Sequence, residues 1–351
     1  MNESSVSFTA MPAVLELLRN ASGLLMNDAQ GAATLFAAAL DSPLLAVPSM
    51  SDFSAANLQQ TVALRVRLGM CLAAANFNMQ QLSDEHLAAA CDAAQAALHE
   101  ASRLPFPQRE ETPPVAMDSA AALPLLQQAL VNLAAHQCIA FAFGGVLLGL
   151  VREGRLLPFD KDLDIVVPLG SFERAVALLP QWGWRPVWVA VRTSNFRCFE
   201  YADTGITLDV FAYDLDAAKG RVLGGWWPQG MPRESGRLLQ FKPFDAELAD
   251  HPHGRHWRVR QPEAILEQLY GANWRVPDPE FDGTLETPAL VAYNTFTRVW
   301  AALRLLEAWT QGKRARFERL LRVLARLDPQ DPVPHWFAAP DDAKVNQGGF
   351  S

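Results

Sequence analysis

Apolar residues in the first hundred positions recur every three to four residues, which is the spacing of amphipathic helices. The clearest runs are AATLFAAAL at 32–40 and HLAAACDAAQAALHEA at 86–101. Breaks at Asp41–Pro43 and Pro48–Ser54 divide the helices, and Ser83, ahead of two acidic residues, is placed to cap the second run. The pattern predicts an all-helical region that ends near Arg103.

The pattern changes after a Pro-rich, polar stretch at Leu104–Val115, which we interpret as a linker. Short strand-like runs then alternate with helical ones. From 288 to 327 the spacing is helical again, with arginines along one face, and the Pro-rich tail after Asp328 is expected to be loose. In chain order, we expect helix 123–136, strand 138–143, a helix from 144, a strand from 162, helix 171–182 capped by Ser171, strands within 184–191, 196–202 and 206–213, loops with short strands at 220–258, and helix 262–270.

These elements predict an α/β (α+β) fold: a small mixed sheet flanked by helices, preceded by an all-α domain. We place a helical domain and linker at 1–115, a catalytic domain at 116–285, and helices and a tail at 286–351. Residues 31–45 resemble one half of a tetratricopeptide-type helix pair, without a second copy at a fixed period.

Composition narrows the classes of function. The net charge of -8 and the pI of about 5.4 argue against a nucleic-acid-binding protein. No apolar run approaches the roughly 20 residues of a membrane span, and the N-terminal residues lack the features of a signal peptide. Together with four scattered cysteines, these features predict a cytoplasmic protein with reduced thiols.

Candidate chemistry lies in two acidic strands. In DLDIVV, the period of two places Asp162 and Asp164 on one face and the apolar residues on the other. In ITLDVFAYD, Asp209 points away from the apolar face. If the two strands are neighbours, three carboxylates converge, and such oxygen ligands suit Mg²⁺, or Mn²⁺, beside a phosphate. Gly144 and Gly145, at a strand-to-helix turn, leave room for that phosphate and offer it free helix N–H groups.

The order of these motifs resembles the LicD/fukutin-type family of nucleotidyltransferase-fold phosphotransferases. Over about 123–282 the chain matches that family's Gly-Gly-x-Leu-Leu-Gly-x-x-Arg run, its acidic motif, its Asp-hydrophobic-Phe and its Tyr-Gly-x-x-Trp element. The departure is Lys161, in the middle of the acidic triplet, where the family usually has Asp. The matching residues are Gly144, Gly145, Leu147, Leu148, Gly149, Arg152, Pro158, Phe159, Asp160, Asp162, Asp164, Asp209, Val210, Phe211, Tyr270, Gly271 and Trp274.

The resemblance implies a sheet of the nucleotidyltransferase type and a Mg²⁺-dependent enzyme. Such an enzyme would transfer a phosphoryl-linked group, for instance phosphocholine or ribitol phosphate, from a CDP-activated donor. The acceptor would be a hydroxyl group of a glycan or small molecule. The resemblance makes Asp162, Asp164 and Asp209 the metal ligands and catalytic residues, and assigns Gly144 and Gly145 to the donor phosphates.

Three neighbouring residues have more than one interpretation. The family match makes Arg152 a phosphate ligand or a structural anchor, and the alternative is a salt bridge on the helix surface. Lys161 is either a phosphate contact or a solvated charge at the strand edge. Asp160 either orients the metal ligands without binding the metal itself or is a turn residue before the strand.

Two other classes of function stay open. One is a nucleotidyltransferase that adds a nucleoside monophosphate to a small molecule or protein. The other is a non-catalytic binding protein, in which the N-terminal helices recognise a protein partner. The three histidines of HPHGRH, His251, His253 and His256, lack a helical i, i+4 pair and indicate a polar loop or a substrate contact.

Overall fold

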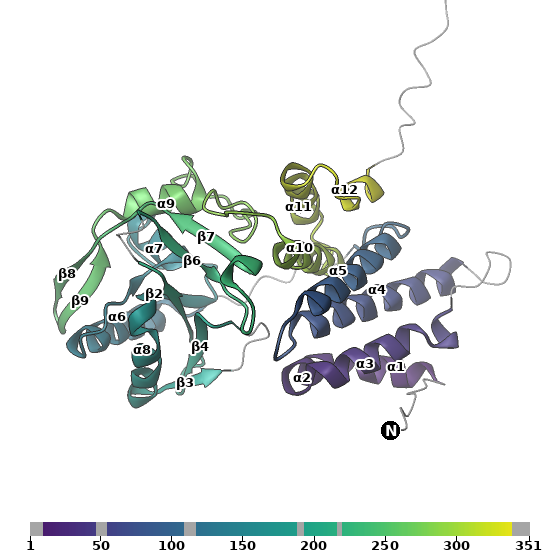
Figure 1. Ribbon diagram of the computed structural model, residues 1–351, viewed down its shortest axis with the longest axis horizontal. Coiled ribbons are helices and arrows are strands. Elements are labelled where there is room, and N and C mark those ends of the chain that lie inside the picture. Colours follow the sequence, from purple (N-terminus) through teal and green to yellow (C-terminus); the bar gives the residue numbers. More distant parts are fainter. Residues whose placement is uncertain (1–9, 47–54, 109–116, 188–192, 216–219, 339–351) are drawn as a thin grey trace, which may run out of the picture.

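The computed structural model describes residues 10–46, 55–108, 117–187, 193–215 and 220–338. Figure 1 shows two halves that lie side by side, one purely helical and one built around a β-sheet. The helical half combines distant parts of the chain, because helices after residue 294 pack with helices before residue 102. None of the described helices is both long and apolar enough to span a membrane.

The helical half begins as the hydrophobic pattern predicts. Ser83 caps the helix α5 (Asp84–Ala101), since its Oγ accepts a hydrogen bond from the backbone N–H of His86 at 3.3 Å. The helices of this half are α1 (Met11–Arg19), α2 (Ala21–Asn27), α3 (Ala29–Leu40), α4 (Ala55–Phe77), α5 (Asp84–Ala101), α10 (Thr295–Thr310), α11 (Arg314–Leu327) and α12 (Val333–Trp336).

The first and last helices share their hydrophobic cores. Phe77 of α4 contacts Phe296 of α10, with ring centroids 4.7 Å apart. Leu98 of α5 belongs to the same buried cluster as Leu305 and Phe317. Removing the N-terminal helices would therefore expose apolar faces of α10 and α11. The proposed boundaries at 115 and 285 stay predictions.

A five-stranded sheet organises the other half. The strands are β1 (Phe141–Ala142), β2 (Asp162–Pro168), β3 (Trp184–Val187), β4 (Phe196–Tyr201) and β5 (Thr207–Tyr213), in the order β1-β2-β5-β4-β3. β2 and β5 are parallel, and the other pairs are antiparallel. The expected mixed sheet flanked by helices is confirmed.

Different helices pack on the two faces of the sheet. On one face, Leu163 and Val210 lie in a core with α6 (Ser119–Ala135) and α8 (Phe172–Leu178). On the other, Val166 and Tyr213 pack with α7 (Gly144–Arg152) and α9 (Pro262–Tyr270). Because side chains alternate along a strand, the aspartates of β2 and β5 lie on the α7 face.

The segment expected to hold loops and short strands contains two hairpins. β6 (Val222–Trp226) pairs with β7 (Arg237–Phe241), and β8 (Ala246–His251) pairs with β9 (Gly254–Val259). Trp226 of β6 stacks on Trp300 of α10, with ring centroids 4.4 Å apart. This stacked pair joins the two halves.

Two expectations about the sheet half are wrong in detail. The strand predicted at 138–143 is reduced to Phe141–Ala142, because Gln137 has a left-handed φ of 59° and the Cys138 N–H bonds back to Leu133 of α6. Ser171 does not cap α8: it ends a 3-10 turn and makes no side-chain cap bond. Of the strand predicted at 184–191, residues 188–191 lie outside the described residues.

Two expectations about the C-terminal part differ from the structure, the second only over its described residues. The helix predicted from 288 begins at Thr295, because residues before it pair with β7, as in the bond from the Val291 N–H to the Leu238 carbonyl. The tail expected to be loose packs against the helices up to residue 338, and residues 339–351 lie outside the described residues. Asp331, whose side chain is 1% exposed, accepts a hydrogen bond from Arg298 at 2.9 Å.

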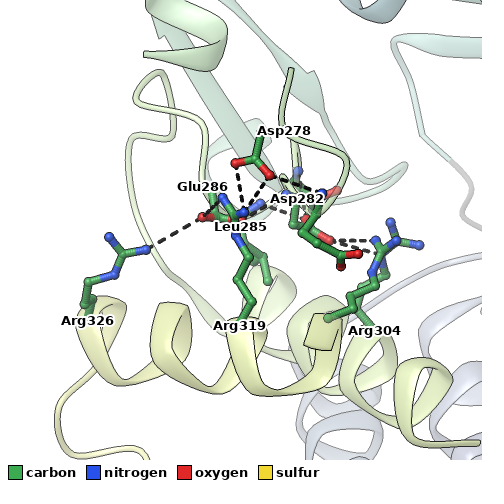
Figure 2. A network of polar contacts seen from close by, with 10 residues as sticks. Asp278, Asp282, Leu285, Glu286, Arg304, Arg319 and Arg326 are labelled. Carbon is green, nitrogen blue, oxygen red and sulfur yellow. Dashed lines mark hydrogen bonds and ion pairs between the residues drawn. The ribbon is translucent and has the colours of Figure 1, made fainter. Parts of the chain in front are cut away.

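An acidic loop at 278–286 ties the sheet half to the arginines of the last helices (Figure 2). The Asp282 side chain is 1% exposed; its Oδ2 accepts from Arg316 at 3.1 Å and lies 3.4 Å from Nε of Arg304. Glu286 accepts two bonds from Arg319, at 2.7 and 2.8 Å. From the other side, buried Arg237 of β7 donates to the backbone carbonyls of the same loop.

We expect Asp282→Ala to lower the free energy of unfolding by about 3 kcal/mol, because it leaves two arginines without their buried partner. Asp250→Ala is the matched control: Asp250 pairs with Arg255 at 3.4 Å, but its side chain is 95% exposed, and such pairs contribute little. Urea unfolding measures both variants. Equal midpoints for the two would contradict a structural role for this network.

Candidate active site

Two aspartates lie side by side where β2 and β5 pair, and a third lies on the same face of β2. In the parallel register, Asp164 lies directly beside Asp209, and Asp162 lies beside Thr207. Neighbouring strands are about 4.8 Å apart, so the Asp164 and Asp209 carboxylates emerge side by side on one face. Each of the three residues keeps part of its surface exposed, which leaves the group within reach of a ligand. The two acidic strands are therefore neighbours, as the metal-site prediction requires.

The glycine pair packs against these carboxylates. Gly144 has a left-handed φ of 56°, and a Cβ at this position would lie 2.7 Å from Oδ2 of Asp164. A Cβ on Gly145 would lie 3.0 Å from Oδ1 of Asp160. The Gly145 backbone also hydrogen-bonds to Asp164, which favours the charged carboxylate and opposes the rise of its pKa. The described contacts of the glycine pair are thus to the acids, and its role toward donor phosphates stays a prediction.

Burial raises the pKa of every acid in this group, and repulsion by neighbouring acids adds to the rise for Asp164 and Asp209. Burial is the main cause for Asp162, opposed by Lys161, and for Asp164, whose pKa is raised further by its acidic neighbours. Burial raises the pKa of Asp209 to about 7, although a hydrogen bond with the Cys198 thiol opposes the rise. The site therefore holds negative charge at a free-energy cost that a bound cation would remove.

Two other buried acids in the chain have basic partners. The side chains of Asp282 and Asp331 are each 1% exposed, and each is paired with arginine. In the part of the chain that the structure describes, no Lys, Arg or His forms an ion pair with Asp162, Asp164 or Asp209. This contrast separates acids that hold the fold together from acids that are left free for a ligand.

The three neighbouring residues of the acidic motif differ in their surroundings. Asp160 is half-buried; burial raises its pKa to about 6, and its Oδ2 has no hydrogen-bond partner among the described atoms. Lys161 is exposed. Arg152 donates to the Trp274 carbonyl at 3.3 Å and to Glu153 at 3.1 Å. These contacts favour the anchor interpretation of Arg152, and its role toward the donor stays a prediction.

The strand beside β5 adds residues that the sequence did not single out. Cys198 is the register partner of Asp209, and Phe196 is the partner of Phe211, with ring centroids 4.7 Å apart. Glu200 lies two residues further along the same face of β4. The alternation in FRCFEY predicts which residues share a face, but only the strand order reveals that this face carries the aspartates. The partly buried phenylalanines give the site an apolar wall.

The donor atoms of this group fit Mg²⁺ or Mn²⁺, which prefer oxygen ligands. Within the described ranges, no three His, Cys, Asp or Glu side chains are assembled as a complete metal-binding group. Mg²⁺ does not require one, since one or two carboxylates commonly hold it together with water and substrate phosphates. The orphaned oxygen of Asp160 and the raised pKa values of its neighbours are consistent with such a partial site.

The three histidines gather at the β8–β9 hairpin. The His251 ring lies 5.5 Å from that of His253 and 5.6 Å from that of His256, centroid to centroid. In the described part of the chain, these histidines do not form a metal-binding group either. The expected polar loop is a two-stranded hairpin, and a role in substrate contact stays a prediction.

We expect Gly144→Ala to destabilise the protein by about 2 kcal/mol, from the strained φ and from the contact of the new methyl group with Asp164. Gly154→Ala is the matched control, because Gly154 has a φ of 69° and a methyl group added there would meet no described atom within 4 Å. The difference between the two in urea unfolding isolates the carboxylate contact. Equal losses would show that Gly144 serves the turn alone.

The raised pKa values also predict how stability depends on pH without metal. An Asp with a folded-state pKa above its unfolded value of about 3.9 adds stability at low pH that is lost as pH rises through the folded-state pKa. With the pKa of Asp160 near 6 and that of Asp209 near 7, stability in EDTA should fall from about pH 4 to about pH 7. Asp209→Asn should flatten this decline. An unchanged slope in that variant would contradict the raised pKa of Asp209.

Comparison with known proteins gives few matches. No protein-family model matches the chain, and no curated protein matches it. The chain is similar to the crystal structure of the lincosamide antibiotic adenylyltransferase LnuA with lincomycin bound, at 12% identity and a TM-score of 0.30, over 43% of this chain and 85% of that one. It is also similar to the solution structure of the antibiotic-resistance factor ANT(2'')-Ia, at 14% identity and a TM-score of 0.28, over 57% of this chain and 97% of that one. These TM-scores are too low to support a function for this chain. The resemblance to the LicD/fukutin-type family stays a prediction.

Proposed function

We propose that this protein is a divalent-metal-dependent transferase that moves a nucleotidyl or other phosphoryl-linked group from a nucleotide donor to a hydroxyl acceptor. One observation carries the proposal: Asp164 and Asp209 lie side by side on parallel strands, with no basic partner among the described residues. A cation bound there would neutralise the charge that develops on a phosphoryl group in transfer.

Each residue of the site has a role in this proposal. Asp162 and Asp164 hold the metal from one strand. Asp209 completes the site from the neighbouring strand, where its carboxylate is placed to take the proton of the acceptor hydroxyl. Gly144 and Gly145 bring the start of α7 close to the carboxylates, where its N–H groups favour an anionic donor.

Two classes of donor fit the site. With a nucleoside triphosphate, the acceptor oxygen attacks the α-phosphorus, the monophosphate is transferred, and pyrophosphate leaves. With a CDP-activated alcohol, the bond between the two phosphates breaks, the alcohol phosphate is transferred, and CMP leaves. The motif resemblance supports the second class. LnuA is named an adenylyltransferase, which is an enzyme of the first class, but its TM-score is too low to decide between the two donor classes.

The alternative of a non-catalytic binding protein predicts a different site. Side chains with a purely structural role would be expected to be paired, as Asp282 is with Arg316. The aspartates of β2 and β5 keep a raised pKa without such a partner among the described residues, which supports a catalytic or metal-binding role. A protein partner for the N-terminal helices is compatible with either function.

Incubation of the protein with Mg²⁺ and a panel of nucleoside triphosphates and CDP-alcohols tests the proposal. We expect release of pyrophosphate or of CMP, and the product identifies the donor class. Asp162→Asn and Asp164→Asn should each lower turnover by about 100-fold or more, which corresponds to about 3 kcal/mol of transition-state stabilisation.

The exposed Asp203, on the turn between β4 and β5, gives the matched control, and Asp203→Asn should keep full turnover. Circular dichroism should show that all three variants are folded. Near-normal turnover of Asp164→Asn at saturating Mg²⁺ would refute the assignment of this site.

A further inference from the structure

Cys198 of β4 lies in a different environment from the other three cysteines. Cys91 and Cys138 are buried in hydrophobic cores, and Cys71 packs against one of these cores. Among the described residues, Cys198 belongs to none of the hydrophobic cores. Apolar packing is the common reason for a buried free cysteine, and it does not account for Cys198.

The strand register places the Cys198 thiol beside an acid of the candidate active site. Cys198 is paired with Asp209 of β5 on one side and with Val187 of β3 on the other, and Val187 is 37% exposed. Side chains paired in this way point to the same face of a sheet, with Cβ atoms about 5 Å apart. The thiol hydrogen-bonds to the Asp209 carboxylate. Its Sγ also lies 3.9 Å from the Phe199 carbonyl oxygen, but a carboxylate is the stronger acceptor.

The two carboxylates that lie side by side each receive one neutral hydrogen-bond donor. The Gly145 backbone N–H donates to Asp164, and the Cys198 thiol donates to Asp209. A neutral donor orients a carboxylate and leaves its negative charge for a cation, whereas an arginine would neutralise that charge. The weak S–H donor is therefore compatible with a metal ligand at Asp209.

The thiol keeps its proton in this environment. Burial, and after it the negative charge of Asp209, raise the pKa of the Cys198 thiol. Because the thiolate is the form of cysteine that binds metals, a protonated thiol does not compete for Mg²⁺, which prefers oxygen ligands. Cys198 can thus act on the metal only through Asp209.

We propose that Cys198 is a positioning residue of the candidate active site: its S–H group holds one oxygen of Asp209 and leaves the other free for the cation. The inference rests on the proposed function, which makes Asp209 a metal ligand. Removal of a group that orients a metal ligand lowers metal affinity or activity by about 10- to 100-fold. We expect an effect at the lower end of this range, because a thiol is a weak donor.

Infrared spectroscopy of the metal-free protein tests the hydrogen bond by itself, at a pH well above the Asp209 pKa of about 7. The S–H stretching band that is lost in Cys198→Ser identifies this thiol among the four free cysteines. We expect this band to move to higher frequency in Asp209→Asn, since a neutral amide is a weaker acceptor than a carboxylate. Asp203→Asn, at the exposed turn, is the control and should leave the band in place. An unmoved band in Asp209→Asn would overturn the proposal.

Calorimetric titration with Mg²⁺ and turnover measurements test the positioning role. Cys198→Ala should weaken Mg²⁺ binding about 10-fold, and its turnover should fall at low Mg²⁺ and recover as Mg²⁺ is raised. Cys198→Ser keeps a hydroxyl donor and should stay close to the unaltered protein in both measurements. Cys71→Ala removes another partly buried thiol, in the helical half, and should change neither.

The outcomes separate this inference from the proposed function. Unchanged Mg²⁺ affinity in Cys198→Ala, or equal losses in Cys198→Ala and Cys198→Ser, would overturn the positioning role. The proposed function would stand in either case if Asp164→Asn is inactive. Absence of Mg²⁺ binding by the unaltered protein would overturn both. Mg²⁺ binding that weakens in Cys198→Ala and is restored in Cys198→Ser, without any transfer activity, would support the positioning role and refute the transfer reaction.

Discussion

Acidic side chains on the α7 face of the sheet, without a basic partner among the described residues, are the constraint around which this half of the molecule is arranged. The parallel pairing of β2 and β5 places Asp164 beside Asp209, and Asp162 follows on the same face. Burial raises the pKa values of these carboxyl groups, and repulsion by neighbouring acids adds to the rise for Asp164 and Asp209. A side chain at Gly144 would collide with Asp164. The glycine, the strand order and the electrostatics all concern the same carboxylates, and the proposed cation would neutralise their charge.

Acidic side chains at the junction of the two halves have the opposite environment. There Asp278, Asp282 and Glu286 of the 278–286 loop are paired with arginines of α10 and α11 (Figure 2). Asp282 also receives two backbone N–H groups, at 3.0 and 3.2 Å. An acid so fully satisfied has no capacity for a ligand. Among the described residues, isolation from basic groups, more than burial, distinguishes the aspartates of β2 and β5 from these acids and supports their proposed role.

Local rules predict the parts of the site that depend on neighbours in sequence. The period of two places Asp162 and Asp164 on one face, and a glycine pair before an apolar run predicts the start of α7. The rest depends on contacts between distant residues. Arg152 meets the Trp274 carbonyl across 122 positions, and Cys198 meets Asp209 because β4 lies next to β5 in the sheet. Nor does the helical periodicity reveal that α10 completes the core of the N-terminal helices.

Isothermal titration calorimetry of the protein with Mg²⁺, in two buffers of different ionisation enthalpy near pH 6.5, tests the central claim most directly. Metal binding to carboxyl groups of raised pKa displaces protons, so the apparent enthalpy should differ between the buffers. We expect binding with proton release in the unaltered protein, and the loss of both in Asp164→Asn. Absence of binding, or binding in Asp164→Asn with the same proton release, would contradict the account.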